Sequence, residues 1–165
     1  EPVELCTRLR TSLADRIATL GGSTQGRLLL ARRCAMLGRG FDREMLERLL
    51  TLEVRSGHQC ARWVLDDLSG LLDELVGLDV LSRETRIDFR FSQRLMWRAL
   101  DAVTDGFADG PKAHTLCGRM KSELFALRGE PPWRLREIES HQARAKNAGS
   151  GAVVPGWDGH ADCWA

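Results

Sequence analysis

The stretch RIDFRFSQRLMWRAL at residues 86–100 decides the fold, because the hydrophobic period changes inside it. Up to residue 91, apolar and charged side chains alternate, which is typical of a half-buried strand. The apolar positions are Ile87, Phe89 and Phe91, and the charged positions are Asp88 and Arg90. After Gln93 the apolar residues recur at helical spacing up to Val103. We therefore predict a strand that leads directly into a helix.

The residues before this strand predict its partner and its packing. Val80 and Leu81 lead into a polar turn at Glu84 and Thr85, so a small β-hairpin is expected here. Its buried face should contain Ile87, Phe89 and Phe91, packed against Leu72, Leu75 and Val76. Asp88 and Arg90 should then face the solvent.

Helical periods dominate the rest of the chain. Apolar residues predict helices over residues 5–20, 28–37, 45–50 and 63–78 before the hairpin. Asp42 is a good N-cap for the third of these, and polar residues 55–57 should form an exposed loop. Helices followed by a two-stranded wing are the element order of a winged-helix domain. The expected fold class is therefore mainly α, with a small β-hairpin.

A breaker cluster at residues 106–111 precedes a second helical block. Apolar residues predict one helix over 116–127 and another that contains Trp133, Leu135 and Ile138. The sequence after Ala148 is rich in glycine, so we expect residues 149–165 to be a weakly structured tail.

Composition excludes several classes of protein. Of the 165 residues, 43% are hydrophobic and 28% are charged, which separates the chain from disordered sequences. Because 24 basic side chains face 23 acidic ones, no global field attracts nucleic acid or an anionic membrane. No apolar run is long enough to span a bilayer, so no membrane partner is expected.

The cysteines and the N-terminus bear on the location of the chain. Five widely spaced cysteines, an odd number, fit reduced cytosolic thiols better than a disulfide framework, so a cytoplasmic location is expected. The chain begins with Glu1 and Pro2 instead of Met, inside a predicted helix. We interpret it as a piece of a longer polypeptide.

Four motifs in the correct order resemble one family. LGRGFD at 37–42, LDELVGLDVLSR at 72–83 and FRFSQRLMWRAL at 89–100 are similar to LGREFD, LDELVEAGLL and YRFRHALVREAL. ALRGEPPWRL at 126–135, with HQARAKNAG at 141–149, resembles RGEPPELLAHHYARAGD. These motifs belong to STAND-type signal-transduction ATPases, as in LuxR-like and MalT-like regulators and ATPase-linked adenylate cyclases. Ser92 departs from the family, which usually has His there.

The resemblance implies a division of the chain and a role. Residues 2–105 would form the winged-helix domain, and 111–148 would begin a tetratricopeptide-like helical array. Such a module is not an enzyme: it would relay signals from downstream helical repeats to an upstream nucleotide-binding domain. No G-x-x-x-x-G-K-[ST] motif is present, so no cofactor is assigned to this chain and ATP is implied only for the parent protein.

The alternative is a freestanding winged-helix regulator that binds DNA. The helix that would enter the major groove carries Asp66, Asp67, Asp73 and Glu74, and carboxylates beside phosphates oppose binding. Arg83, Arg86 and Arg90 cluster in the hairpin and form the one candidate contact for an acidic partner or a phosphate. A solvated hairpin whose arginines pair with Glu84 and Asp88 explains the same residues, and we favour it.

Some histidines and cysteines have a spacing that could bind a metal, but ordinary packing explains them as well. His114 and Cys117 repeat the spacing of His160 and Cys163, which allows a zinc site in principle. Cys117 also lies on an apolar stripe, where a thiol behaves as a small hydrophobic group. We therefore assign no metal site and no catalytic residue.

Overall fold

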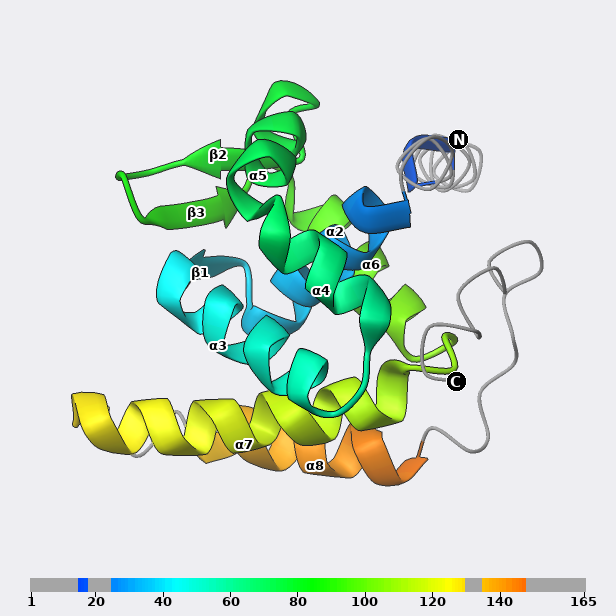
Figure 1. The fold of residues 1–165 in the computed structure, drawn as a ribbon, viewed down its shortest axis with the longest axis vertical. Helices are drawn as coiled ribbons and strands as arrows, with labels where there is room; N and C mark the ends of the chain where they lie inside the picture. Colours follow the sequence, from blue (N-terminus) through cyan, green and yellow to red (C-terminus); the bar gives the residue numbers. More distant parts are fainter. Residues whose placement is uncertain (1–14, 18–24, 130–134, 148–165) are drawn as a thin grey trace, which may run out of the picture.

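The computed structural model describes residues 15–17, 25–129 and 135–147, and these are mainly helical with a small antiparallel sheet (Figure 1). The elements in chain order are α2 Gln25–Leu37, β1 Gly40–Asp42, α3 Arg43–Arg55, α4 Gln59–Asp66, α5 Leu68–Gly77, β2 Leu81–Arg83, β3 Asp88–Phe91, α6 Arg94–Thr104, α7 Gly110–Arg128 and α8 Leu135–Asn147. Residues 15–17 are helical, and the rest of the helix expected at 5–20 lies outside the described residues.

The sheet has three strands in the order β1-β3-β2, all antiparallel. The hairpin β2–β3 was predicted, whereas β1 was not, because three residues are too few to show a period. In the register of β1 and β3, Phe41 is opposite Phe89, and their rings stack with centroids 5.9 Å apart. This pair anchors the sheet on the helices.

The predicted alternation in β3 is confirmed at most positions. Phe89 and Phe91 are buried, at 2% and 1% exposure, and Arg90 is exposed. Ile87 was expected to be buried but is 55% exposed. Pairing in β3 starts at Asp88, so Ile87 falls in the turn, outside the pleat that directs side chains to the core. The expected contact with Leu72, Leu75 and Val76 stays a prediction.

The single helix expected over 63–78 is wrong, because the structure breaks it into α4 and α5 at Asp67. Asp67 has φ −117° and ψ 32°, which is not helical. Its carboxylate occupies the space that a Cβ on Gly70 would need, 2.5 Å from that position. A side chain at residue 70 would therefore force the Asp67 carboxylate to move.

The helices predicted over 28–37, 45–50 and 116–127 and after Gln93 are confirmed as α2, α3, α7 and α6. Helix α8 contains Leu135 and Ile138 of the last predicted helix, whereas Trp133 lies outside the described residues. The Asp42 side chain accepts a hydrogen bond of 3.0 Å from the Met45 amide, as expected of an N-cap. Helix α7 packs against α3 and α8. Helices α7 and α8 lie side by side at one end of the described part of the molecule (Figure 1). The expected tail at 149–165 lies outside the described residues, and the boundary between 2–105 and 111–148 stays a prediction. Among the helices described, none has the length and apolar character needed to cross a bilayer.

The stacked pair of phenylalanines generates a stability test. Phe89→Ala should lower the free energy of unfolding by about 3 to 5 kcal/mol, because it removes a buried ring from the Phe41 stack. Arg90→Ala, on the exposed side of the same strand, should cost less than about 0.5 kcal/mol. Urea unfolding of both variants measures the difference, and equal losses would contradict the strand assignment.

Candidate functional site

A buried charge network surrounds the carboxylate of Asp109, the residue immediately before α7. Arg32 donates to it from Nη1 over 2.8 Å and from Nη2 over 3.3 Å. Arg33 donates from Nη2 over 2.7 Å, and Nε2 of His58 lies 3.4 Å from the same carboxylate. One carboxylate thus joins α2, the residue that caps α4 and the start of α7.

The network continues from Arg33 to α3. The Arg33 Nε atom donates to both carboxylate oxygens of Glu53, over 2.8 and 3.0 Å. The side chains of Arg33 and Glu53 are both 0% exposed. Two arginines are therefore balanced by two carboxylates in the interior, an arrangement that avoids an uncompensated buried charge.

The arginines keep Asp109 ionised. Burial by itself would raise the pKa of Asp109, but Arg33, the hydrogen bond with His58 and Arg32 together hold that pKa well below its usual range. Burial raises the pKa of Glu53, and the charge of Arg33 opposes that rise. The centre of the network is therefore a fixed negative charge at any ordinary pH.

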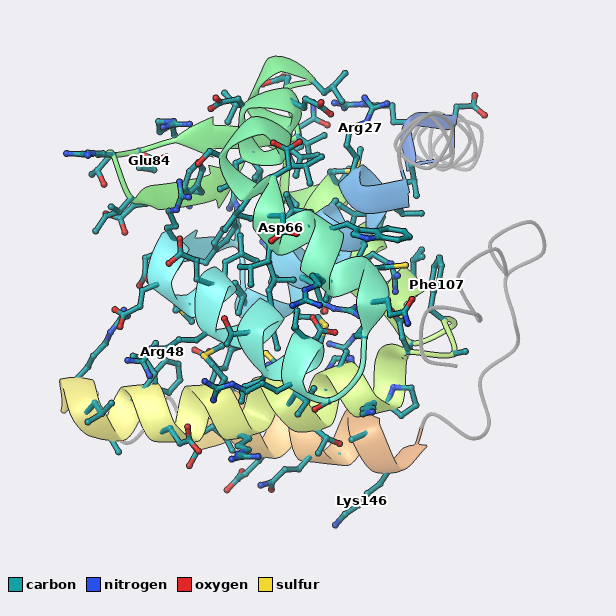
Figure 2. All side chains as sticks on the ribbon, in the orientation of Figure 1. Arg27, Arg48, Asp66, Glu84, Phe107 and Lys146 are labelled. Carbon is teal, nitrogen blue, oxygen red and sulfur yellow. The ribbon has the colours of Figure 1, made fainter. Side chains whose placement is uncertain are left out.

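The local sequence explains why two arginines are inside. Helix α2 is buried along most of its length, so Arg32 and Arg33 have no solvent face available. The Arg32 guanidinium also lies 3.7 Å from the ring centroid of Phe107. Phe107 lies in the loop between α6 and α7 (Figure 2). Its Nε atom is buried and has no hydrogen-bond acceptor in the described part of the chain.

Sequence reasoning missed this network. The available signal was the run RLLLARRCAML, in which apolar residues occupy every face of the helix, so that the two arginines had to be buried. Asp109 gave no signal of its own, since an acidic residue in a breaker cluster is ordinary for a turn.

A second cluster joins α7 and α8. The Nδ1 atoms of His114 and His141 are 2.9 Å apart, so one Nδ1–H donates a hydrogen bond to the Nδ1 atom of the other ring. His114 Nε2 lies 3.1 Å from the Asp105 carboxylate, and the Cys117 thiol lies 3.5 Å from His141 Nε2. Arg144 binds Asp105 and makes two hydrogen bonds, of 2.9 and 3.0 Å, with the Asp101 carboxylate.

Burial lowers the pKa of both histidines in this cluster. Desolvation and the nearby charge of Arg144 lower the pKa of His114 to about 4, although Asp105 opposes the shift. Desolvation, with Lys121, His114 and Arg144 nearby, lowers the pKa of His141 to about 2. Both rings are therefore neutral at pH 7.

Of the cysteines in the described residues, Cys34 and Cys117 are buried thiols. Burial raises the pKa of the Cys117 thiol to about 11, so it stays protonated beside the neutral His141 ring. Cys34 and Cys117 are free and buried, whereas Cys60 forms a disulfide bond. The expectation of reduced thiols is therefore wrong at Cys60.

The residues weighed for zinc do not form a site in the part of the chain that is described. His114 and Cys117 are each within hydrogen-bond distance of His141, yet no group of at least three potential metal ligands was found within residues 15–17, 25–129 and 135–147. His160 and Cys163 lie outside those residues.

The structure does not bring the three hairpin arginines together. Arg83 is opposite Phe89 in the register of β2 and β3, and its guanidinium lies 5.1 Å from that ring. Arg90 is opposite Ser82, so it points to the other face of the sheet. Arg83 pairs with Asp73 of α5 over 2.6 Å, not with Glu84 or Asp88 as expected. Arg86 lies in the exposed turn.

Comparison with known proteins found no match: no family model, no curated protein and no solved structure is similar enough to this chain.

The paired histidines predict a pH dependence of stability. In the unfolded chain both would have a pKa near 6.5, so the unfolded state binds more protons than the folded state between about pH 4 and 6.5. The free energy of unfolding should therefore fall as the pH decreases, by about 1 kcal/mol per histidine between pH 7 and 5.5.

Urea unfolding at several pH values measures this slope. The variants His114→Gln and His141→Gln should each show a shallower slope than the natural sequence, because each removes one neutral buried imidazole. A natural sequence with constant stability from pH 7 to 5.5 would contradict the assignment of neutral buried rings.

Proposed function

We propose that this chain is a non-catalytic coupling module of a signal-transduction ATPase or transcription regulator of the STAND type. It relays the state of downstream helical repeats to an upstream nucleotide-binding domain. Its partners are those two regions of the parent protein. ATP is the cofactor of the parent, bound upstream, since this chain lacks the phosphate-binding motif.

The order of the elements supports the winged-helix part of this proposal. Helix α2, strand β1, helix α3 and the pair α4–α5 precede the hairpin β2–β3, and the sheet order is β1-β3-β2. Helices followed by a hairpin that leads into a further helix are the element order of a winged-helix domain, which the motifs at 37–42, 72–83 and 89–100 suggest.

The observation that carries the coupling role is the position of Asp109. This residue immediately precedes α7, the first helix of the second predicted block, yet Arg32, Arg33 and His58 of the first block hold its carboxylate. Buried, directional ion pairs resist displacement, so a movement of α7 would act on α2 directly. Coupling between distant sites needs a rigid connection of this kind with two alternative packings.

A cytoplasmic location belongs to the same proposal. It is supported by the resemblance to cytoplasmic regulators. Reduced cysteines no longer support it, because Cys60 forms a disulfide bond.

Nucleotide exchange in the longer protein tests the proposal. The coding sequence upstream should contain a G-x-x-x-x-G-K-[ST] motif, and Asp109→Asn should change the rate of nucleotide release at least about fivefold, the usual lower range of allosteric coupling. Asp66→Asn is the matched control, because Asp66 is exposed on α4 (Figure 2). Circular dichroism establishes that both variants fold. An unchanged release rate in folded Asp109→Asn would contradict the coupling role.

The alternative, a freestanding DNA-binding regulator, has one supporting observation, the exposed Arg86 and Arg90 of the hairpin. Against it, the helices α4 and α5 that would enter the groove, and the break between them, expose four carboxylates, those of Asp66, Asp67, Asp73 and Glu74. A mobility shift of duplex DNA at low salt, abolished by charge reversal at Arg83, Arg86 and Arg90, would favour this alternative and contradict the coupling role.

A further inference from the structure

A cleft of about 470 Å³ opens between the end of α2 and helices α6 and α8, with Lys121 of α7 at its base. Its charged lining comes from segments far apart in the sequence: Arg39 after α2, Asp101 on α6, Lys121 on α7, and Arg136, Glu137 and Arg144 on α8. A volume of this size lies within the usual range of small-molecule sites. We call it the arginine cleft.

The charges that line the arginine cleft do not balance. Lys121 pairs with Glu137 over 3.1 Å, and Arg144 binds Asp101 in bidentate fashion. These two pairs satisfy both carboxylates of the lining. Arg39 and Arg136 are then left without a carboxylate partner among the described residues.

Arg39 carries a specific sign of an unmet interaction. Its Nε atom is buried but has no hydrogen-bond acceptor within the described residues. A buried donor without a partner costs free energy, which a bound acceptor would recover. Arg136 lines the same cleft from the first turn of α8 and is exposed to solvent.

The wall of the cleft also offers an apolar surface. Trp97 of α6 lines it, and its indole is fixed because Nε1 donates to the Ala35 carbonyl over 3.0 Å. A fixed aromatic side chain beside two guanidinium groups suits a molecule with an anionic head and a flat or apolar body.

We propose that the arginine cleft binds a small organic anion, whose phosphoryl or carboxylate group is held by Arg39 and Arg136 and whose body lies along Trp97. Both guanidinium groups present donors in the planar geometry that these anionic groups accept. The ligand would bridge the turn after α2, α6 and α8. This proposal is independent of the coupling role, because it requires only the residues of the cleft.

Nuclear magnetic resonance of the whole chain tests it, with inorganic phosphate and acetate as separate probes at constant ionic strength. The indole N–H signal of Trp97, identified by its loss in Trp97→Phe, should shift and saturate with at least one anion. Preference for phosphate or for acetate identifies the head group. A signal that does not saturate with either anion overturns the proposal.

Variants locate the binding. Arg136→Gln, at an exposed position, and Arg39→Gln should each weaken the anion at least about tenfold, as expected for a lost charge-assisted hydrogen bond. Arg90→Gln is the matched control, because Arg90 is exposed and lines a neighbouring cleft but not this one. Equal weakening in Arg90→Gln would show general charge attraction, and no weakening in Arg136→Gln would show that Arg136 does not hold the anion. Either result overturns the proposal.

Discussion

The carboxylate of Asp109 is the constraint on which the rest of the structure depends. Arg32 and Arg33 lie on a helix without a solvent face, so their charges need partners inside the protein. Removing one partner from a buried ion pair leaves an uncompensated charge, which typically costs 3 to 5 kcal/mol. Glu53 alone cannot satisfy both guanidinium groups, and Asp109 must therefore be drawn into the core. The position of α7 follows, since Asp109 immediately precedes its first turn.

The position of α7 determines where α8 packs and where the arginine cleft lies. Helix α8 packs on α7 through the pair His114–His141, and Arg144 ties it to Asp101 and Asp105 at the end of α6. This arrangement leaves the arginine cleft between α8 and the end of α2. The proposed coupling role and the proposed anion site both depend on this one packing of α7 and α8.

Local patterns in the sequence predicted α2, α3, α6 and α7 from their helical period, and the strand at 88–91 from the period of two that burial of Phe89 and Phe91 imposes. They did not predict β1, which is too short, or the break between α4 and α5 at Asp67. The buried network was not predicted either. Its hydrogen-bonded pairs are 20 to 77 residues apart in the sequence, so tertiary packing decides which residues become partners. The arginine cluster expected in the hairpin was separated by the pleat, which a list of neighbouring residues does not reveal.

Amide hydrogen exchange tests the central claim, that Asp109 joins α7 to the core of α2 and α3 as one cooperative unit. The natural sequence and Asp109→Ala would be compared by mass spectrometry under native conditions. Our account predicts that amides in α2, α3 and α7 lose protection together in Asp109→Ala, by a common free energy of about 3 to 5 kcal/mol. A loss of protection confined to the first turns of α7, with α2 and α3 unchanged, would contradict it.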